Sequence, residues 1–148
     1  MKIQTTRFGN IEINETSLIN FPNGIIGFED LKQFYIINKE RTDSFWWLQS
    51  LEKLEIAFLI ADPRCFLSDY NPTLTKEDMH TLQISDPTEV EFGVILTIPE
   101  DPRETTANLL APIAINMSNK TATQIIMRDN RCSARYMIMQ PVTAGSSE

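Results

Sequence analysis

The amino-acid sequence predicts an all-β protein, a small antiparallel single domain with one or two short helices. Short stretches that alternate apolar and polar side chains, or that are rich in aromatic and β-branched residues, recur along most of the chain between turn residues. Long helical patterns do not alternate with them, which argues against a parallel α/β sheet. Many short strands within 148 residues are typical of an antiparallel barrel or sandwich.

The expected strands begin with a hairpin, in which residues 2–6 and 11–14 flank the turn Phe8-Gly9-Asn10. Residues 55–61 are nearly all apolar after the first, as in a strand buried on both faces. Pro112 falls inside another expected strand, and because proline cannot donate to a ladder, that strand should lie at an edge or bulge there. The full set is residues 2–6, 11–14, 17–21, 34–38, 45–49, 55–61, 65–70, 90–98, 108–116, 121–127 and 135–139.

The clearest helix signal covers residues 74–82, where Thr75 can cap the N-terminus and Glu77 and Asp78 lie in the first turn. Residues 29–34 are expected to form one further short turn. The length suits one domain, expected over residues 1–141, and the small polar residues 142–148 are expected to form a disordered tail. The sequence has neither a secretory signal nor an apolar run of about 18 residues, so we expect a cytoplasmic protein without membrane contact.

Acidic residues are concentrated in the middle of the chain. The net charge is −7, and residues 52–101 hold eleven Asp and Glu against three Lys and Arg. Nucleic-acid binding requires clustered Lys and Arg, so direct binding of DNA or RNA is not expected. The acidic segment fits a basic protein partner, because complementary electrostatic fields raise the rate at which two proteins associate. A solvated acidic surface that favours solubility is an equally good interpretation.

The residues that usually carry catalysis are sparse. His80 is the single histidine, and Cys65 and Cys132 lie far apart and form no metal-binding motif. We therefore expect no enzyme activity, no metal, no cofactor and no small-molecule substrate. The enzymatic alternative is a thiol enzyme in which one of the cysteines meets His80.

Two aromatic segments are candidates for recognition. In the loop from Gly24 to Glu29, two glycines surround an apolar pair, and Phe28 either faces a partner or plugs the end of the fold. In the strand over residues 45–49, Trp46 must point opposite to Phe45 and Trp47, so at least one of these aromatics should reach the surface. Exposed aromatics anchor protein interfaces. They also serve carbohydrate- or peptide-binding β-domains, which is the alternative function.

Several segments together resemble the bacterial flagellar assembly factor FliW family, and the resemblance spans roughly residues 3–139. The matching residues are Thr6-Arg7-Phe8-Gly9, Gly24 to Glu29, Leu48-Gln49-Ser50, Ala57-Phe58, Asp62-Pro63, Phe66, Asp69-Tyr70, Thr105 through Asn116, and Gln124. The run from Thr105 to Asn116 is specific in combination with the others. Trp46-Trp47 is bulkier than this position needs, which is a minor departure.

The resemblance implies a small β-barrel-like domain and two competing partners, flagellin and the RNA-binding translational regulator CsrA. The resemblance implies that unassembled flagellin holds FliW. Once flagellin is exported, the released FliW binds CsrA and relieves the repression of flagellin mRNA by CsrA. The acidic stretch would repel RNA phosphates beside the basic surface of CsrA. Turn, acidic and aromatic positions supply the candidate partner-binding residues, although Asp62-Pro63 also suits a simple turn and Asn108 a strand-end hydrogen bond. The candidates are Phe28, Glu29, Trp46, Asp62, Phe66, Asp69, Tyr70, Asn108 and Leu110.

Overall fold

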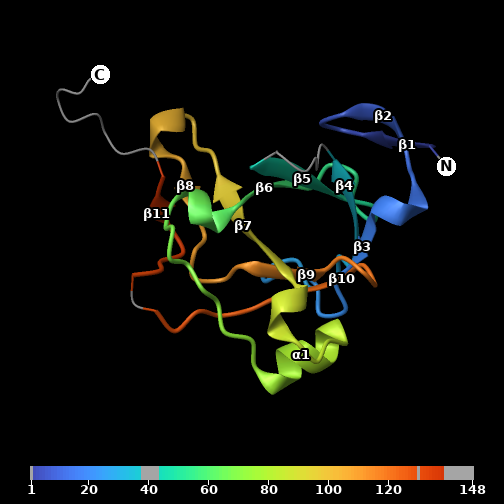
Figure 1. Cartoon of the computed structure of the whole chain (residues 1–148). Helices are drawn as coiled ribbons and strands as arrows, with labels where there is room; N and C mark the ends of the chain where they lie inside the picture. Colours follow the sequence, from blue (N-terminus) through green and yellow to red (C-terminus); the bar gives the residue numbers. More distant parts are fainter. Residues whose placement is uncertain (1, 38–43, 130, 139–148) are drawn as a thin grey trace.

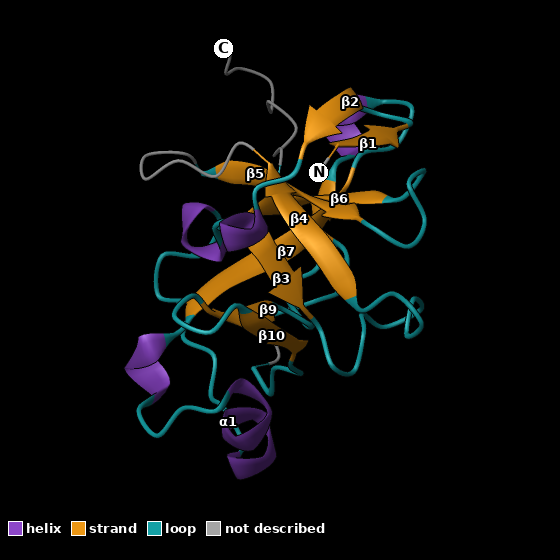
Figure 2. Ribbon diagram, turned by 90° about the vertical axis from the view of Figure 1, so that its right-hand side faces the viewer, coloured by secondary structure: helices purple, strands orange, loops and turns teal. Residues whose placement is uncertain are grey.

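A computed structural model describes residues 2–37, 44–129 and 131–138, and its centre is a closed β-barrel (Figures 1 and 2). Seven strands form the ring in the order β7-β6-β5-β4-β3-β10-β9, and β9 pairs back onto β7. The barrel strands are β3 (Leu18–Asn20), β4 (Gln33–Ile37), β5 (Phe45–Ser50), β6 (Ala57–Ala61), β7 (Glu91–Thr97), β9 (Ile113–Asn116) and β10 (Thr121–Gln124). The predicted all-β fold is therefore confirmed, with closure as a barrel.

Closure depends on β7, the longest strand. Its first half pairs with β9, with Glu91 opposite Ile115, whereas its second half pairs with β8 (Thr106–Ala107) on the same side. β8 in turn pairs with β11 (Tyr136–Met137), so these two short strands extend the sheet beyond the barrel. Among the strands that the structure describes, all pairings are antiparallel except that of β3 with β10, where Asn20 lies opposite Thr121. This parallel pair departs from the expected purely antiparallel sheet.

The predicted N-terminal hairpin is present as a separate two-stranded sheet of β1 (Lys2–Thr5) and β2 (Gly9–Glu12). The turn lies slightly earlier than predicted, because Thr5 is opposite Gly9, whose φ is +67°. The hairpin loop packs on β5: the guanidinium of Arg7 lies 4.6 Å from the ring centroid of Trp47, and the ring of Phe8 contacts the same indole edge-on.

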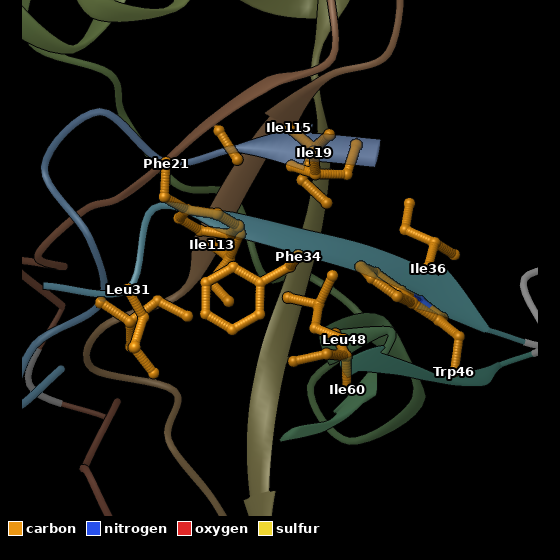
Figure 3. Close-up of a cluster of buried hydrophobic side chains, with 12 residues drawn as sticks. Ile19, Phe21, Leu31, Phe34, Ile36, Trp46, Leu48, Ile60, Ile113 and Ile115 are labelled. Carbon is orange, nitrogen blue, oxygen red and sulfur yellow. The ribbon is translucent and has the colours of Figure 1, made fainter. Parts of the chain in front are cut away.

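The barrel interior is filled by apolar side chains that every barrel strand contributes (Figure 3). Phe21 and Phe34 meet edge-to-face at 5.2 Å between ring centroids, and Trp46 lies beside Ile36 at one end of the cluster. A second buried cluster combines residues of β6 and β7 with the loop after η2 (Pro63–Cys65) and with the chain beyond β7. Its members are Ala61, Tyr70, Val94, Leu96, Ala107, Leu109, Met127 and Cys132.

The predicted helix is confirmed as α1 (Lys76–Leu82). Thr75 and Asp78 form a capping box: the Thr75 hydroxyl accepts from the Asp78 N–H, and the Asp78 carboxylate accepts from the Thr75 N–H, both at 3.0 Å. Leu82 buries itself against Ala114 and Ile125, so α1 packs on β9 and β10 (Figure 1). The described residues contain no helix long and apolar enough to cross a membrane.

Residues 65–70 were expected to be a strand, and that prediction is wrong. The segment begins with the 3₁₀-helix η2 (Pro63–Cys65) and continues as a loop. The Asp62 carboxylate caps the N-terminus by accepting from the Arg64 N–H at 3.0 Å, and Pro63 is preset for the first helical position. Local capping therefore overrides the apolar pattern. Three further 3₁₀-helices are η1 (Glu15–Ser17), η3 (Pro87–Glu89) and η4 (Pro102–Glu104).

Other boundaries differ for equally local reasons. Of the short turn expected over residues 29–34, only the start is present, where the Leu31 N–H donates to the Phe28 carbonyl at 3.0 Å. The turn does not continue, because the Glu52 carboxylate accepts from the N–H groups of Lys32 and Gln33 and β4 begins there. The expected strand over residues 108–116 shortens to β9, because Pro112 precedes it and cannot donate. The expected disordered tail, residues 142–148, lies outside the described residues.

Candidate partner-binding groove

An open groove runs between α1 and the chain that continues from β10. Its volume is about 900 Å³, and a smaller hollow of about 350 Å³ joins it, since both are lined by Glu77, Asp78 and Gln124. The two hollows together are called the acidic groove here. One wall is α1 with the loop before it, the other is residues 124–129, and the smaller end is closed by the loop of residues 23–29.

Residues 124–128 continue the direction of β10 past its last ladder partner. The N–H of Ile125 donates to the Pro112 carbonyl at 2.9 Å, and the N–H of Met127 donates to the Leu110 carbonyl at 2.7 Å. Side chains alternate accordingly: Ile125 and Met127 are buried, whereas Ile126 is 57 % exposed in the groove. An apolar side chain thus faces solvent beside acidic neighbours.

The loop from Gly24 to Glu29 is fixed to this wall through Gln124. The Gln124 side chain accepts from the Ile26 N–H at 2.8 Å and donates to the Ala111 carbonyl at 2.9 Å. Gly24 and Gly27 have φ of +69° and +89°, which glycine adopts without strain. The resulting turn leaves Ile26 60 % exposed at the end of the groove.

The groove is negatively charged. Five carboxylates line it against the two guanidinium groups of Arg128 and Arg131. Arg131 bridges two of the acids, with N–O distances of 2.9 Å to Asp69 and 2.7 Å to Asp129, so its charge is compensated. Its hydrogen bonds to Asp129 lower the pKa of that carboxyl. The carboxylates are Glu29, Asp69, Glu77, Asp78 and Asp129.

Two of the predicted site residues, Glu29 and Asp69, line opposite ends of the groove. The carboxylate of Glu29 accepts from the Gly27 N–H at 3.0 Å, and main-chain hydrogen bonds of this kind lower its pKa, so it is charged at neutral pH. Phe28 lies outside the groove: it is 37 % exposed, and its ring packs edge-on against Phe58 at 5.2 Å. Phe28 is therefore partly packed on the fold and partly accessible, and its contact with a partner stays a prediction.

Four other candidates gather in one place. Tyr70 belongs to the second buried cluster, and its hydroxyl donates to the Leu109 carbonyl at 2.6 Å, whereas Phe66 and Leu110 are partly buried and pack against that cluster. Asn108 lies in the same segment as Leu110, and its side chain accepts from the Ala111 N–H at 3.0 Å, a local structural role. Asp62, the fifth, is exposed and caps η2.

Trp46 is only 3 % exposed and so offers no surface anchor in this structure. The alternation predicted for β5 is confirmed: Phe45 is exposed, and Trp47 lies on its side of the strand beneath Arg7 and Phe8. Neither tryptophan presents a flat open ring of the kind that stacks on sugars. The structure therefore gives no support to the carbohydrate-binding alternative.

Sequence reasoning missed the groove wall formed by Ile126 and Arg128. The sequence predicts an ordinary strand over residues 121–127. Only the positions of the neighbouring strands in the structure show that the last part of this segment extends beyond the barrel. The available signal was Pro112, which cannot pair fully with a neighbouring strand.

The described part of the chain holds no group of three or more His, Cys, Asp and Glu side chains placed to bind a metal. Of the two cysteines, Cys65 is exposed and Cys132 is buried. Burial, together with the nearby Asp129, raises the pKa of the Cys132 thiol, which disfavours the nucleophilic thiolate.

Comparison with known proteins gives one family. The family model described as FliW protein matches residues 2–138. The chain is 38 % identical to the flagellar assembly factor FliW of Bdellovibrio bacteriovorus over 138 residues, covering 93 % of this chain and 79 % of that protein. It is 40 % identical to the FliW of Syntrophus aciditrophicus over 140 residues, covering 95 % and 89 %.

The fold agrees with the sequence. A crystal structure of the flagellar assembly factor FliW superposes with a TM-score of 0.84 at 31 % identity, covering 95 % of this chain and 99 % of that one. The fold of this chain is thus one already known in this family. The chain is a member of the FliW family of flagellar assembly factors.

Proposed function

We propose that this protein is a non-catalytic partner switch that binds flagellin and, when flagellin is absent, binds CsrA in the cytoplasm and relieves repression of flagellin mRNA. The observation that carries the proposal is membership of the FliW family over residues 2–138, in sequence and in fold. The acidic groove offers a surface for a protein ligand, because exposed apolar side chains and carboxylates both line it.

The acids that act on CsrA are those around α1. The acidic segment 52–101 divides between the two ends of β7, which are about 20 Å apart for a seven-residue strand. Glu77 in α1 and Asp86 and Glu89 at η3, which precedes β7, are exposed at the α1 end. Glu100 and Asp101 follow the other end of β7. Asp101 is also paired with Arg103 at 3.0 Å, which compensates its charge.

A regulator that binds RNA must carry clustered Lys and Arg, because it neutralises phosphates. The acids at the α1 end would attract that surface and repel the phosphates that compete for it. At about 0.1 M salt, charges separated by more than about 10 Å are largely screened, so the acids at the far end of β7 should contribute little.

The test is a competition between purified proteins. The chain is titrated by calorimetry with flagellin and with CsrA from the same organism, and CsrA binding to flagellin mRNA is then followed with and without the chain. We expect both proteins to bind, flagellin to displace CsrA, and the chain to reduce RNA binding. If the chain binds neither protein, the proposed partner switch is wrong.

Two charge reversals test the electrostatic part. Glu77→Lys changes the α1 end and Glu100→Lys the far end, with the same change in net charge. Glu77→Lys should weaken CsrA binding several-fold and flatten its dependence on salt, whereas Glu100→Lys should behave like the wild type. Equal effects of the two variants would mean that net charge, and not the acidic groove, governs association.

A further inference from the structure

The edge of the chain beyond β10 is open on the groove side. At its start, β10 has a strand on each side, with Thr121 opposite Asn20 of β3 and opposite Asn116 of β9. β3 ends at Asn20, and the chain turns away after Phe21, whose carbonyl accepts from the Gly24 N–H at 2.9 Å. Residues 124–128 therefore keep neighbours on the β9 side but have lost the parallel strand on the other.

Ile126 presents unused main-chain groups at this edge. The N–H groups of Ile125 and Met127 point toward residues 110–112, so in an extended chain the N–H and carbonyl of Ile126 point the opposite way. Within the described residues, neither group of Ile126 has a hydrogen-bond partner. A strand edge with free donors and acceptors is a template for a further strand.

The surroundings of Ile126 define what fits. The larger hollow of the acidic groove lies beside it, has a volume of about 900 Å³ and is lined by carboxylates that include the exposed Glu77. Glu29, which is charged at neutral pH, lines the smaller hollow that joins it. The side chains of Ile26 and Ile126 supply apolar contacts within the same groove. The complementary ligand alternates apolar and basic residues along an extended chain.

We propose that the acidic groove binds a basic segment of a partner protein in extended conformation, which adds a strand to the edge at Ile126. Main-chain hydrogen bonds to Ile126 provide the register, the exposed isoleucines receive the apolar side chains, and the carboxylates receive the Lys or Arg side chains. The identity of the partner rests on the proposed function. The chemistry of the ligand follows from the groove alone.

Amide hydrogen exchange gives the most direct test, because the mode predicts an alternating pattern. The protein is measured by NMR alone and with saturating flagellin, CsrA or the synthetic peptide acetyl-Lys-Val-Lys-Val-Lys-Val-Lys-amide. Exchange at Ile126 should slow about tenfold or more on binding, whereas Ile125 and Met127, which are already hydrogen-bonded, should change less. The matching peptide with Glu in place of Lys should not bind.

Two variants separate the main-chain contact from the side chain. Ile126→Ala keeps the N–H and removes apolar surface, whereas Ile126→Pro removes the N–H as well without breaking a hydrogen bond among the described residues. Ile126→Pro should weaken binding about five- to tenfold more than Ile126→Ala, the effect of one net hydrogen bond. If Ile126→Pro does not fold, the lysine–valine peptide with N-methylated valines tests the same hydrogen bonds from the ligand side and should bind more weakly.

The outcomes distinguish this proposal from the partner switch. If flagellin or CsrA binds while exchange at Ile126 stays unchanged, or if the ligand binds there as a helix, strand addition is wrong and the partner switch stands. If neither protein binds, the partner switch fails and the lysine–valine peptide decides: slowed exchange at Ile126 supports strand addition, and unchanged exchange overturns it.

Discussion

The two glycines of the loop from Gly24 to Glu29 form a matched pair for testing how this loop is built. Both have positive φ, +69° at Gly24 and +89° at Gly27, so alanine at either position is strained. They differ in space. A Cβ on Gly24 would lie 2.6 Å from both the Cα and the carbonyl oxygen of Glu29, whereas a Cβ on Gly27 would meet nothing within 4 Å.

The expected costs follow from this difference. Backbone strain at positive φ costs about 1–2 kcal/mol, and the lower entropy of the unfolded alanine chain offsets part of it, so Gly27→Ala should cost about 1 kcal/mol. Gly24→Ala must also move the backbone at Glu29, and overpacking of this kind costs about 1–3 kcal/mol more. Its total should be about 2–4 kcal/mol.

Urea unfolding followed by tryptophan fluorescence measures both variants, with the free energy taken from linear extrapolation at equal m-values. Gly24→Ala should also disturb the groove end, because it shifts the loop that Gln124 holds through the Ile26 N–H. Costs that agree within about 0.5 kcal/mol would refute the assignment of Gly24 to a close backbone contact and leave only the shared φ effect.

Three further changes test the buried contacts and the charge network. Tyr70→Phe removes a hydroxyl that donates to a buried main-chain carbonyl at 2.6 Å, and should lower the free energy of unfolding by about 1–3 kcal/mol in urea titration. Gly93→Ala would place a methyl against Ile60 and the Trp46 ring, and should lower the melting temperature, consistent with an overpacking cost of about 1–3 kcal/mol. The pKa of the Asp129 carboxyl is lowered in the folded protein from its ordinary value of 3.8. The charged carboxylate therefore stabilises the fold at pH values above 3.8, and this stabilisation is lost as the pH falls through the pKa of the folded state. Thermal melts of Asp129→Asn should therefore show a weaker loss of stability between about pH 5 and pH 2 than the wild type.

Elements whose signals are local could be predicted from the sequence. The capping box at Thr75 and Asp78 is complete within four residues, and it defines the start of α1. The alternation around Trp46 likewise assigned the correct faces of β5. Residues 65–70 show how the same reasoning fails: the apolar residues suggested a strand, but the cap at Asp62 and the fixed φ of Pro63 wound the chain into a 3₁₀ turn.

The groove could not be predicted, because its parts meet only through long-range contacts. Ile26 and Gln124 are 98 positions apart, and a single side-chain hydrogen bond joins them. From the sequence, Glu29 belongs to a loop and Asp69 to an expected strand, and nothing local indicates that one groove includes both. The sequence also does not show which acids share a surface. The acids of the segment 52–101 are continuous in sequence, but β7 separates those that lie near α1 from those that follow its other end.

The open edge at Ile126 follows from the way the barrel ends its own pairing. On the β9 side, Pro112 can accept from the Ile125 N–H but has no N–H to return, so the ladder weakens at the boundary of β9. On the β3 side, the chain reaches Pro22 just after Asn20, and proline again cannot extend a ladder. Residues 124–128 remain extended because Met127 is still hydrogen-bonded and buried. A strand that extends beyond the end of its neighbour stays extended, and its main-chain groups on that side have no partner strand. A ligand chain can therefore pair with the strand at the point where the neighbour ends.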